Sequence, residues 1–238
     1  MTARVLAILN HPDSGLGRYR DWLADAGVEV TLQPGAEGLP ADLDGVDGLV
    51  MLGGGLMPDD DEKAPWLPQE RRLTAAALED RVPVLGICLG GQLLAMVGGG
   101  QVRADHGVVE RGATQIHLTD AADGDGLLGG LPARFYAIEN HRDAITALPP
   151  QAVHLAYSDD CPHQAFRLGP VAWGLQFHPE ASAENVARWD REKVHDDGFD
   201  HDELIRFARS VEPQSARACR AIAEAFAAAV LDYARAPS

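Results

Sequence analysis

Nearly continuous apolar runs alternate with segments of helical spacing through the first hundred residues of the chain. The apolar runs are RVLAIL (4–9), VDGLVMLGGG (46–55) and VPVLGIC (82–88). Continuous runs of this length are typical of parallel strands that are covered on both faces. The segments 16–26 and 66–81 between them have the periodicity of amphipathic helices. Strands and helices in this order predict a doubly wound, mostly parallel α/β sheet.

The pattern changes near residue 100 and again for the last fifty residues. Short β-rich runs such as ATQIHLT and AVHLAYS follow one another without long helices, which predicts a mixed or antiparallel extension of the same sheet. After them come ENVARWDREKV, then DELIRFARS behind a capping box of Asp200 and Glu203, then a further helix over SARACRAIAEAFAAAVLDYA. We therefore expect one domain over residues 1–185, with helices over 186–238 packed on it.

Charge and composition narrow the classes of partner. The 238 residues carry 36 acidic and 20 basic side chains, a formal charge of -16, which repels nucleic acid and anionic membrane surfaces. No apolar run approaches the roughly 20 residues of a membrane span, so a cytoplasmic protein is expected. Cys88, Cys161 and Cys219 form no C-x-x-C pair, and we expect neither a disulfide framework nor a zinc site.

Cys88 lies at the end of an apolar run, in the stretch GICLGGQ (86–92). Glycines two positions before and after it, Gly86 and Gly90, have the spacing of a nucleophile elbow, a sharp turn from strand to helix. A helix beginning at the next residue would stabilise a thiolate through its free N–H groups. The alternative is that Cys88 is a small apolar core residue, since free cysteines are often buried.

A nucleophilic cysteine needs a base, and His178 is the best candidate. The segment AWGLQFHPEAS (172–182) ends an apolar strand with His178 and Glu180, so a base and a carboxylate to orient it emerge together. His141, in NHRD, is a competing base, but no apolar strand brings a carboxylate beside it. The two segments together make Cys88, His178 and Glu180 candidates for a nucleophile, its base and the group that orients the base.

The motifs GICLGGQLLA and GLQFHPE together resemble the class I (triad) glutamine amidotransferases. The resemblance extends to the GMP synthase amidotransferase domain and its stand-alone relatives at LNHPDSGLG, NHRDAI and CPHQAFRLGP. It implies a flavodoxin-like fold in which Cys88 is the nucleophile, His178 the base and later the acid, and Glu180 the orienting carboxylate. It also implies a γ-glutamyl thioester, released ammonia and hydrolysis to glutamate, with no cofactor and no metal.

The family's oxyanion hole and substrate contacts are carried over by position. The resemblance implies that the backbone N–H groups of Leu89 and Gly55 stabilise the oxyanion, with Gly55 in LGGGLMP and Leu56 in place of the family's proline. The expected contacts to glutamine are the side chain of Gln92 and the backbone around Asn140, His141, Arg142 and Asp143. A dinucleotide loop at the same glycines is the weaker interpretation, because no G-x-G-x-x-G follows.

Three functions remain open at this point. The first is a glutaminase that passes ammonia to a separate synthetase subunit. The second is a free-standing hydrolase of γ-glutamyl amines or peptides, and the third is an inactive regulatory homologue. Glutamine or a γ-glutamyl small molecule is the expected ligand. The acidic DGDG (123–126) and the loop around His195 and His201 are interpreted as surface turns and not as metal sites.

Overall fold

The structure, a computed structural model, describes residues 2–236 and contains a nine-stranded sheet in the order β2-β1-β3-β4-β11-β10-β9-β6-β7. The first five strands in this order run parallel: β2 (Val28–Pro34), β1 (Ala3–Leu9), β3 (Gly48–Met51), β4 (Val84–Ile87) and β11 (Ala172–Leu175). The remaining strands are antiparallel: β10 (Ala165–Leu168), β9 (Val153–Tyr157), β6 (Glu110–Leu118) and β7 (Arg134–His141). A separate two-stranded sheet pairs β5 (Gln101–Arg103) with β8 (Ala144–Ala147).

The parallel half confirms the predicted doubly wound arrangement, in the flavodoxin-like order 2-1-3-4-5 with β11 as the fifth strand. The continuous apolar runs have the expected cause, because both faces of the sheet are covered. Along β1, Val5 and Ala7 enter one hydrophobic core, and Leu6 and Ile8 enter the core on the opposite face. The antiparallel half confirms the mixed extension predicted after residue 100.

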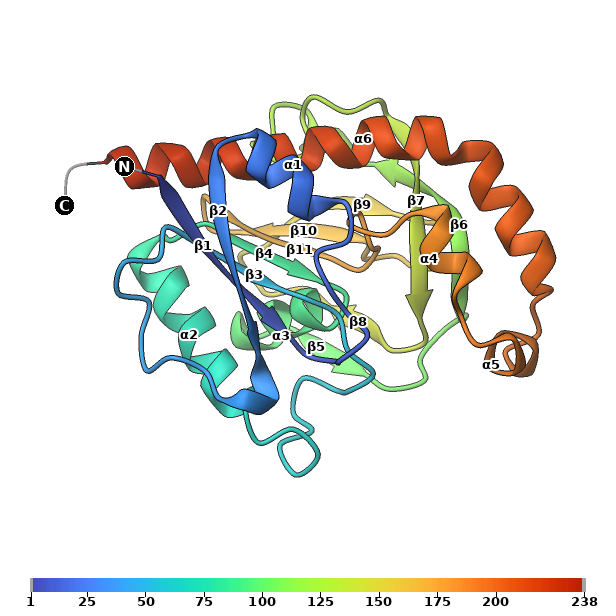
Figure 1. Ribbon diagram of the computed structural model, residues 1–238, viewed down its shortest axis with the longest axis horizontal. Helices are drawn as coiled ribbons and strands as arrows, with labels where there is room; N and C mark the ends of the chain where they lie inside the picture. The colour runs from blue at the N-terminus through green and yellow to red at the C-terminus, as the bar shows by residue number, and fades with distance from the viewer. Residues whose placement is uncertain (1, 237–238) are drawn as a thin grey trace.

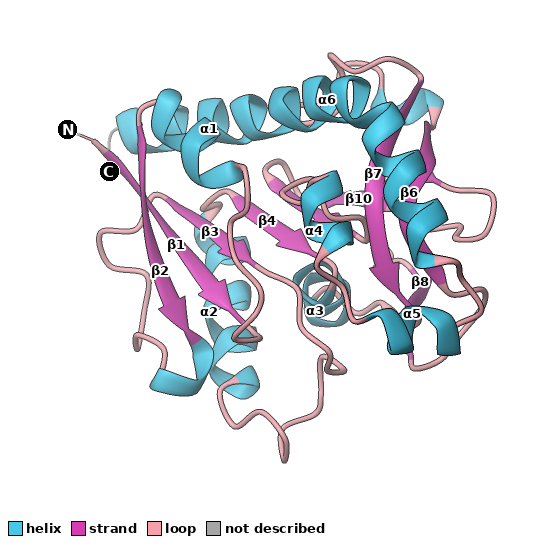
Figure 2. Ribbon diagram, turned by 45° about the vertical axis from the view of Figure 1, so that its right-hand side comes forward, coloured by secondary structure: helices cyan, strands magenta, loops and turns pink. Residues whose placement is uncertain are grey.

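Helices pack on both faces of the sheet (Figures 1 and 2). The helices are α1 (Tyr19–Asp25), α2 (Leu67–Asp80), α3 (Leu89–Val97), α4 (Ala183–Ala187), α5 (Arg191–Asp196) and α6 (His201–Arg235), with 3-10 turns at Gly35–Glu37 and Asp120–Ala122. The helices α1 and α6 contribute to one core, and α2 and α3 to the other. Because α6 contacts α1, β1, β6 and β7, it joins the parallel and antiparallel halves.

The C-terminal region differs from the sequence prediction in two places. The segment ENVARWDREKV forms the two short helices α4 and α5, because Asp190 caps the start of α5 by accepting bonds from two backbone N–H groups. The two helices expected after Asp200 are one continuous helix, α6, which contains Pro213. A proline removes one backbone hydrogen bond and bends a helix, and α6 is visibly bent in Figure 1. Burial of its apolar face offsets that cost.

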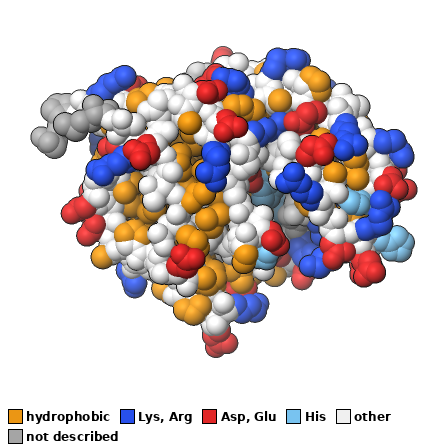
Figure 3. Space-filling model, viewed as in Figure 1, with side chains coloured by type: hydrophobic (Ala, Val, Ile, Leu, Met, Phe, Trp, Pro, Cys, Tyr) orange, Lys and Arg blue, Asp and Glu red, His pale blue; other side chains and the backbone are white. Residues whose placement is uncertain are grey.

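The surface carries charged side chains of both signs. Acidic and basic side chains are interspersed over the face shown in Figure 3. Among residues 2–236, no helix is both long and apolar enough to cross a membrane.

Candidate active site

Three neighbouring parallel strands end beside one another and bring together segments that are far apart in the sequence. The strand β4 lies between β3 and β11, so the residues that follow these strands share one edge of the sheet. A Cβ atom added at Gly53, after β3, would lie 2.9 Å from Cε1 of His178 and 3.4 Å from Cβ of Cys88. The structure therefore brings Cys88 and His178 together at the carboxyl ends of parallel strands, where α/β sheets place their sites.

Cys88 occupies the sharp turn that its glycine neighbours predicted. Its backbone has φ 54° and ψ -110°, a conformation that costs a side-chain-bearing residue free energy, and its N–H donates to the Leu175 carbonyl at 2.8 Å. A Cβ at Gly86 would overlap the Gly90 backbone, and one at Gly90 would overlap the Met51 carbonyl. Only glycine fits these positions because α3 begins directly against the sheet.

The N-terminus of α3 lies at the same turn. Its first hydrogen bond runs from the Gln92 N–H to the Cys88 carbonyl at 2.9 Å. The N–H groups of Leu89, Gly90 and Gly91 precede this bond and have no acceptor within the helix. These N–H groups and the helix dipole favour negative charge on Cys88 or on a bound ligand.

His178 and Glu180 form a hydrogen-bonded pair in which Glu180 is buried and His178 is largely shielded from solvent. Nδ1 of His178 lies 2.7 Å from Oε1 of Glu180, and the His178 backbone N–H donates to the Ile138 carbonyl of β7 at 2.8 Å. Burial by itself lowers the pKa of His178, but the Glu180 carboxylate and the Cys88 sulfur outweigh it and hold that pKa well above its ordinary value. Among residues 2–236, Nε2 has no hydrogen-bond partner. It is thus the ring nitrogen available for proton exchange.

The loop after β1 and the helix α6 support the Glu180 segment. The Arg18 N–H donates to the Glu180 carbonyl at 3.1 Å, and Gly17 approaches that carbonyl so closely, at φ 49°, that a side chain would overlap it. The Arg18 guanidinium pairs with Glu212 of α6, which also accepts from the Ala183 N–H at 3.0 Å. The C-terminal helix is thereby linked to the site.

Gln176 is a residue of this site that the sequence reasoning missed. Its amide nitrogen lies 3.7 Å from the Cys88 sulfur, and its Oε1 accepts from Nε2 of Gln92 at 3.1 Å. The same Gln92 nitrogen donates to the Asp143 carbonyl at 3.1 Å. Gln176 directly follows β11 and lies two positions before His178, and this closeness to the histidine was the signal that could have identified it.

The glycine turn after β3 lies beside the first residue of α3. A Cβ at Gly54 would lie 3.1 Å from both the Asn10 carbonyl oxygen and the Leu89 side chain. Gly55, the expected oxyanion donor, is exposed and has no neighbour within 4 Å of such a Cβ. Gly54 is therefore the glycine that packs against Leu89.

The four residues expected around the substrate divide into two groups. Asn140 and Arg142 are exposed, and their side chains bond to Arg111 and to Asp105 and Asp197. His141 is buried, and the Asp143 carbonyl is tied to the site through Gln92. Among residues 2–236, the contacts connect the second group to the Cys88 region and do not connect the first.

The other two cysteines are in different surroundings. Burial raises the pKa of Cys161 to about 12 and that of Cys219 to about 11. Both stay protonated at neutral pH, and a thiol is a poor nucleophile compared with a thiolate. Neither cysteine shares the helix N-terminus and the histidine that Cys88 has.

Comparison with known protein families shows to which family the chain belongs. Residues 11–188 match the family model "Glutamine amidotransferase class-I". The chain belongs to the class I glutamine amidotransferases. This confirms the resemblance predicted from GICLGGQLLA and GLQFHPE, and the two motifs lie where the geometry above is found.

Individual members of the family resemble the chain over most of its length. A glutamine-hydrolyzing subunit of GMP synthase from Thermoplasma volcanium is 36% identical over 182 residues, 74% of this chain and 84% of the relative. The glutamine-hydrolyzing GMP synthase of Porphyromonas gingivalis is 37% identical over 143 residues, only 26% of its own length. The crystal structure of a glutamine amidotransferase from Thermotoga maritima superposes with a TM-score of 0.85 at 28% identity, covering 95% of this chain and 99% of that one.

Proposed function

We propose that the chain hydrolyses the side-chain amide of glutamine and releases glutamate and ammonia. The observation that supports this best is the position of Cys88, in a strained turn at the N-terminus of α3 and beside the His178–Glu180 pair. A nucleophile, a base and a group that orients the base are the three parts of a covalent amide hydrolase.

The reaction proceeds in two halves. The Cys88 thiolate attacks the amide carbon, and the protonated Nε2 of His178 donates its proton to the leaving nitrogen, so that ammonia departs and a γ-glutamyl thioester remains. The His178 imidazole then takes a proton from water while the water oxygen attacks the thioester. Collapse of this second adduct breaks the carbon–sulfur bond and regenerates the Cys88 thiolate and the imidazolium. Glu180 holds the ring in the required orientation throughout.

Backbone N–H groups stabilise the oxyanion in both halves of the reaction. One donor is the Leu89 N–H, directly after the nucleophile, at the start of α3. The second is the Gly55 N–H in the glycine turn after β3, where the space beside Gly55 is open and the neighbouring Gly54 packs against Leu89. The loss of one such donor typically reduces the rate by a factor of about a hundred to a thousand.

Gln92 and the segment after β7 hold the substrate. Because Nε2 of Gln92 already donates to Gln176 and Asp143, its Oε1 is the atom left to accept a hydrogen bond from the substrate amide. The backbone of residues 140–143 binds the amino acid end of glutamine. The ammonia then passes to a separate synthetase, which is favoured by the match to a relative named as one subunit of GMP synthase.

Thioester formation and ammonia release test the proposal directly. We expect the purified chain to release glutamate and ammonia from glutamine, and hydroxylamine to trap γ-glutamyl hydroxamate. The Cys88→Ala variant should lose at least about a thousandfold in rate, because the nucleophile and its base act as a unit. Cys219→Ala, which removes a buried thiol from α6, is the matched control and should keep the activity.

A comparison of several substrates distinguishes the three possible functions. Glutamine, γ-glutamyl amines and γ-glutamyl peptides are compared, with and without a candidate synthetase. Hydrolysis of γ-glutamyl peptides in strong preference to glutamine would identify a free-standing γ-glutamyl hydrolase. Full retention of hydrolysis by Cys88→Ala would contradict the proposed mechanism, and no hydrolysis of any member would favour an inactive regulatory protein.

A further inference from the structure

Three buried side chains with metal-binding atoms lie close together where β6 begins and β7 ends, at one end of the antiparallel half of the sheet. They are Glu110 at the start of β6, His141 at the end of β7 and Cys161 in the turn between β9 and β10. Their ligand atoms all lie within 4.8 Å of one another. An imidazole nitrogen, a thiol sulfur and a carboxylate oxygen are the donors that zinc and related transition metals prefer.

Hydrogen bonds outside this cluster orient the donor atoms toward its centre. Nδ1 of His141 lies 3.1 Å from the Asp143 carbonyl, an oxygen that can only accept, so this nitrogen carries the hydrogen. Nε2 lies 2.8 Å from Oε2 of Glu110, a hydrogen-bond distance, so a proton lies between these two atoms, and a bound cation would take its place. A backbone carbonyl that fixes the ring in this way is the usual support for a metal-binding histidine.

The Glu110 carboxylate is held by two further donors. The Ser158 hydroxyl donates to Oε1 at 2.7 Å, and the Gln164 amide donates to Oε2 at 2.8 Å. Both residues lie in the segment that also contains Cys161. This segment therefore supplies one proposed ligand, Cys161, and orients a second, Glu110. Such outer contacts are characteristic of a built metal site.

Glu139 places a further buried carboxyl group beside the cluster. This side chain is 0% exposed, and neither of its carboxylate oxygens has a hydrogen-bond partner among residues 2–236. Its Oε2 lies 3.5 Å from Nε2 of His141. A carboxylate in such surroundings has to be neutralised by a proton or by a cation, because burial of an unpaired charge is expensive.

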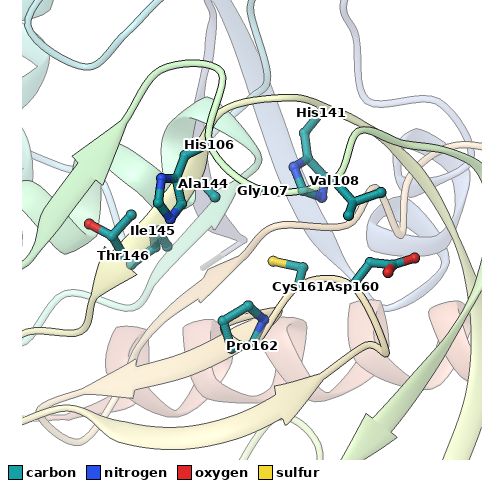
Figure 4. A pocket seen from close by; sticks show the side chains of 10 residues that line it. All are labelled: His106, Gly107, Val108, His141, Ala144, Ile145, Thr146, Asp160, Cys161 and Pro162. Atoms are coloured by element: carbon teal, nitrogen blue, oxygen red, sulfur yellow. The ribbon is translucent and has the colours of Figure 1, made fainter. Parts of the chain in front are cut away.

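A cavity of about 130 Å³ opens onto the cluster and provides a route of entry. His141 and Cys161 line it from two different segments, and His106, Val108, Asp160 and Pro162 are among the other lining residues drawn in Figure 4. A site with three protein ligands and an accessible fourth position can hold a water molecule or an exchangeable ligand.

We propose that Glu110, His141 and Cys161 bind one divalent transition-metal ion of the zinc class, with the fourth coordination position facing this cavity. When the ion binds, the proton between His141 and Glu110 and the proton of the Cys161 thiol are both released to solvent, and no electron is transferred. The ion would connect β6, β7 and the β9–β10 turn. No sequence motif indicated it, because the ligands come from three segments that only the fold brings together.

Cobalt(II) titration of the Cys88→Ala chain tests the site, because this background removes the active-site thiol. We expect about one ion per chain and an intense near-ultraviolet thiolate-to-cobalt absorption band, which zinc should abolish by displacement. Cys161→Ser in the same background should lose the band and bind at least about tenfold more weakly. Cys219→Ser is the matched control, since it also removes a buried free thiol, and it should keep both.

A second measurement covers the case in which Cys161→Ser does not fold. X-ray absorption of the zinc-loaded Cys88→Ala chain should show one sulfur at about 2.3 Å and nitrogen or oxygen ligands at about 2.0–2.1 Å. Coordination by nitrogen and oxygen alone, a thiolate band that persists in a folded Cys161→Ser, or its loss in Cys219→Ser would overturn the proposal. These measurements need no hydrolytic activity, so their outcome is independent of the proposed function.

Discussion

At the scale of single residues, the charge on Glu180 helps to keep His178 protonated, because it raises the pKa of the imidazole. The two lie 2.7 Å apart in a buried site, where burial lowers the pKa of His178 and the Glu180 carboxylate helps to raise it. Glu180→Gln keeps the shape of the side chain and removes its charge. The raising effect is then lost while burial remains, so the pKa of His178 should fall. The imidazolium that protonates the leaving ammonia would be lost at lower pH.

We expect the alkaline limb of the kcat/KM profile for glutamine to move down by about one pH unit or more in Glu180→Gln. The rate at the optimum should also fall, but less than in Cys88→Ala. Glu184→Gln removes an exposed carboxylate that pairs with Arg209, and its profile should match that of the unmodified chain. An unshifted alkaline limb in Glu180→Gln would show that Glu180 does not control the charge of His178.

The strand-to-helix turn between β4 and α3 is the element that aims the nucleophile, and its glycines make the turn possible. A Cβ at Gly90 would overlap the Met51 carbonyl, a rigid backbone atom that has no free direction in which to move. Gly90→Ala should therefore displace the start of α3 and lower the free energy of unfolding by at least about 2 kcal/mol. Because the displaced turn carries Cys88, most of the hydrolytic activity should be lost as well.

Urea unfolding measures this effect, with Gly130→Ala as the matched control. Gly130 is exposed and a Cβ added to it meets nothing within 4 Å, so the control should change the unfolding free energy by no more than about 0.5 kcal/mol. Equal unfolding midpoints for the two variants would mean that α3 can shift away from β3 without cost, contrary to the packing described above.

For the whole molecule, the features that sequence patterns alone predicted are those encoded within one segment, and the pairing of Cys88 with His178 also needed the resemblance to a known family. The continuous apolar run of β1 predicts that both faces of the strand are covered. The spacing of Gly86 and Gly90 predicts the turn at Cys88. The partnership of Glu110 with His141 depends on the register of β6 against β7, where these two residues are directly paired. A single sequence does not specify that register. The Gln176 contact with Cys88 likewise requires the adjacency of β4 and β11.

Glu70 links the stability of the whole molecule to pH. It is fully buried on α2, where Asn10 donates to its Oε1 at 3.0 Å, and burial raises its pKa to about 7. In the unfolded chain a glutamate has a pKa near 4.3. The folded state therefore binds more protons between these two values, so the free energy of unfolding falls as the pH rises from about 4.5 to about 7 and levels off above that.

Glu70→Gln should remove this fall of the unfolding free energy with rising pH, because an amide oxygen can accept the same hydrogen bond from Asn10 without carrying a charge. At pH 8 the variant should exceed the unmodified chain in unfolding free energy by on the order of 2–3 kcal/mol, and the difference should shrink toward zero as the pH is lowered to about 5. Thermal unfolding at a series of pH values measures it. Glu79→Gln, at an exposed position of the same helix, should show no such trend. A constant difference between Glu70→Gln and the unmodified chain at every pH would mean that Glu70 does not titrate in this range, and that its carboxyl is held in one charge state by the groups around it.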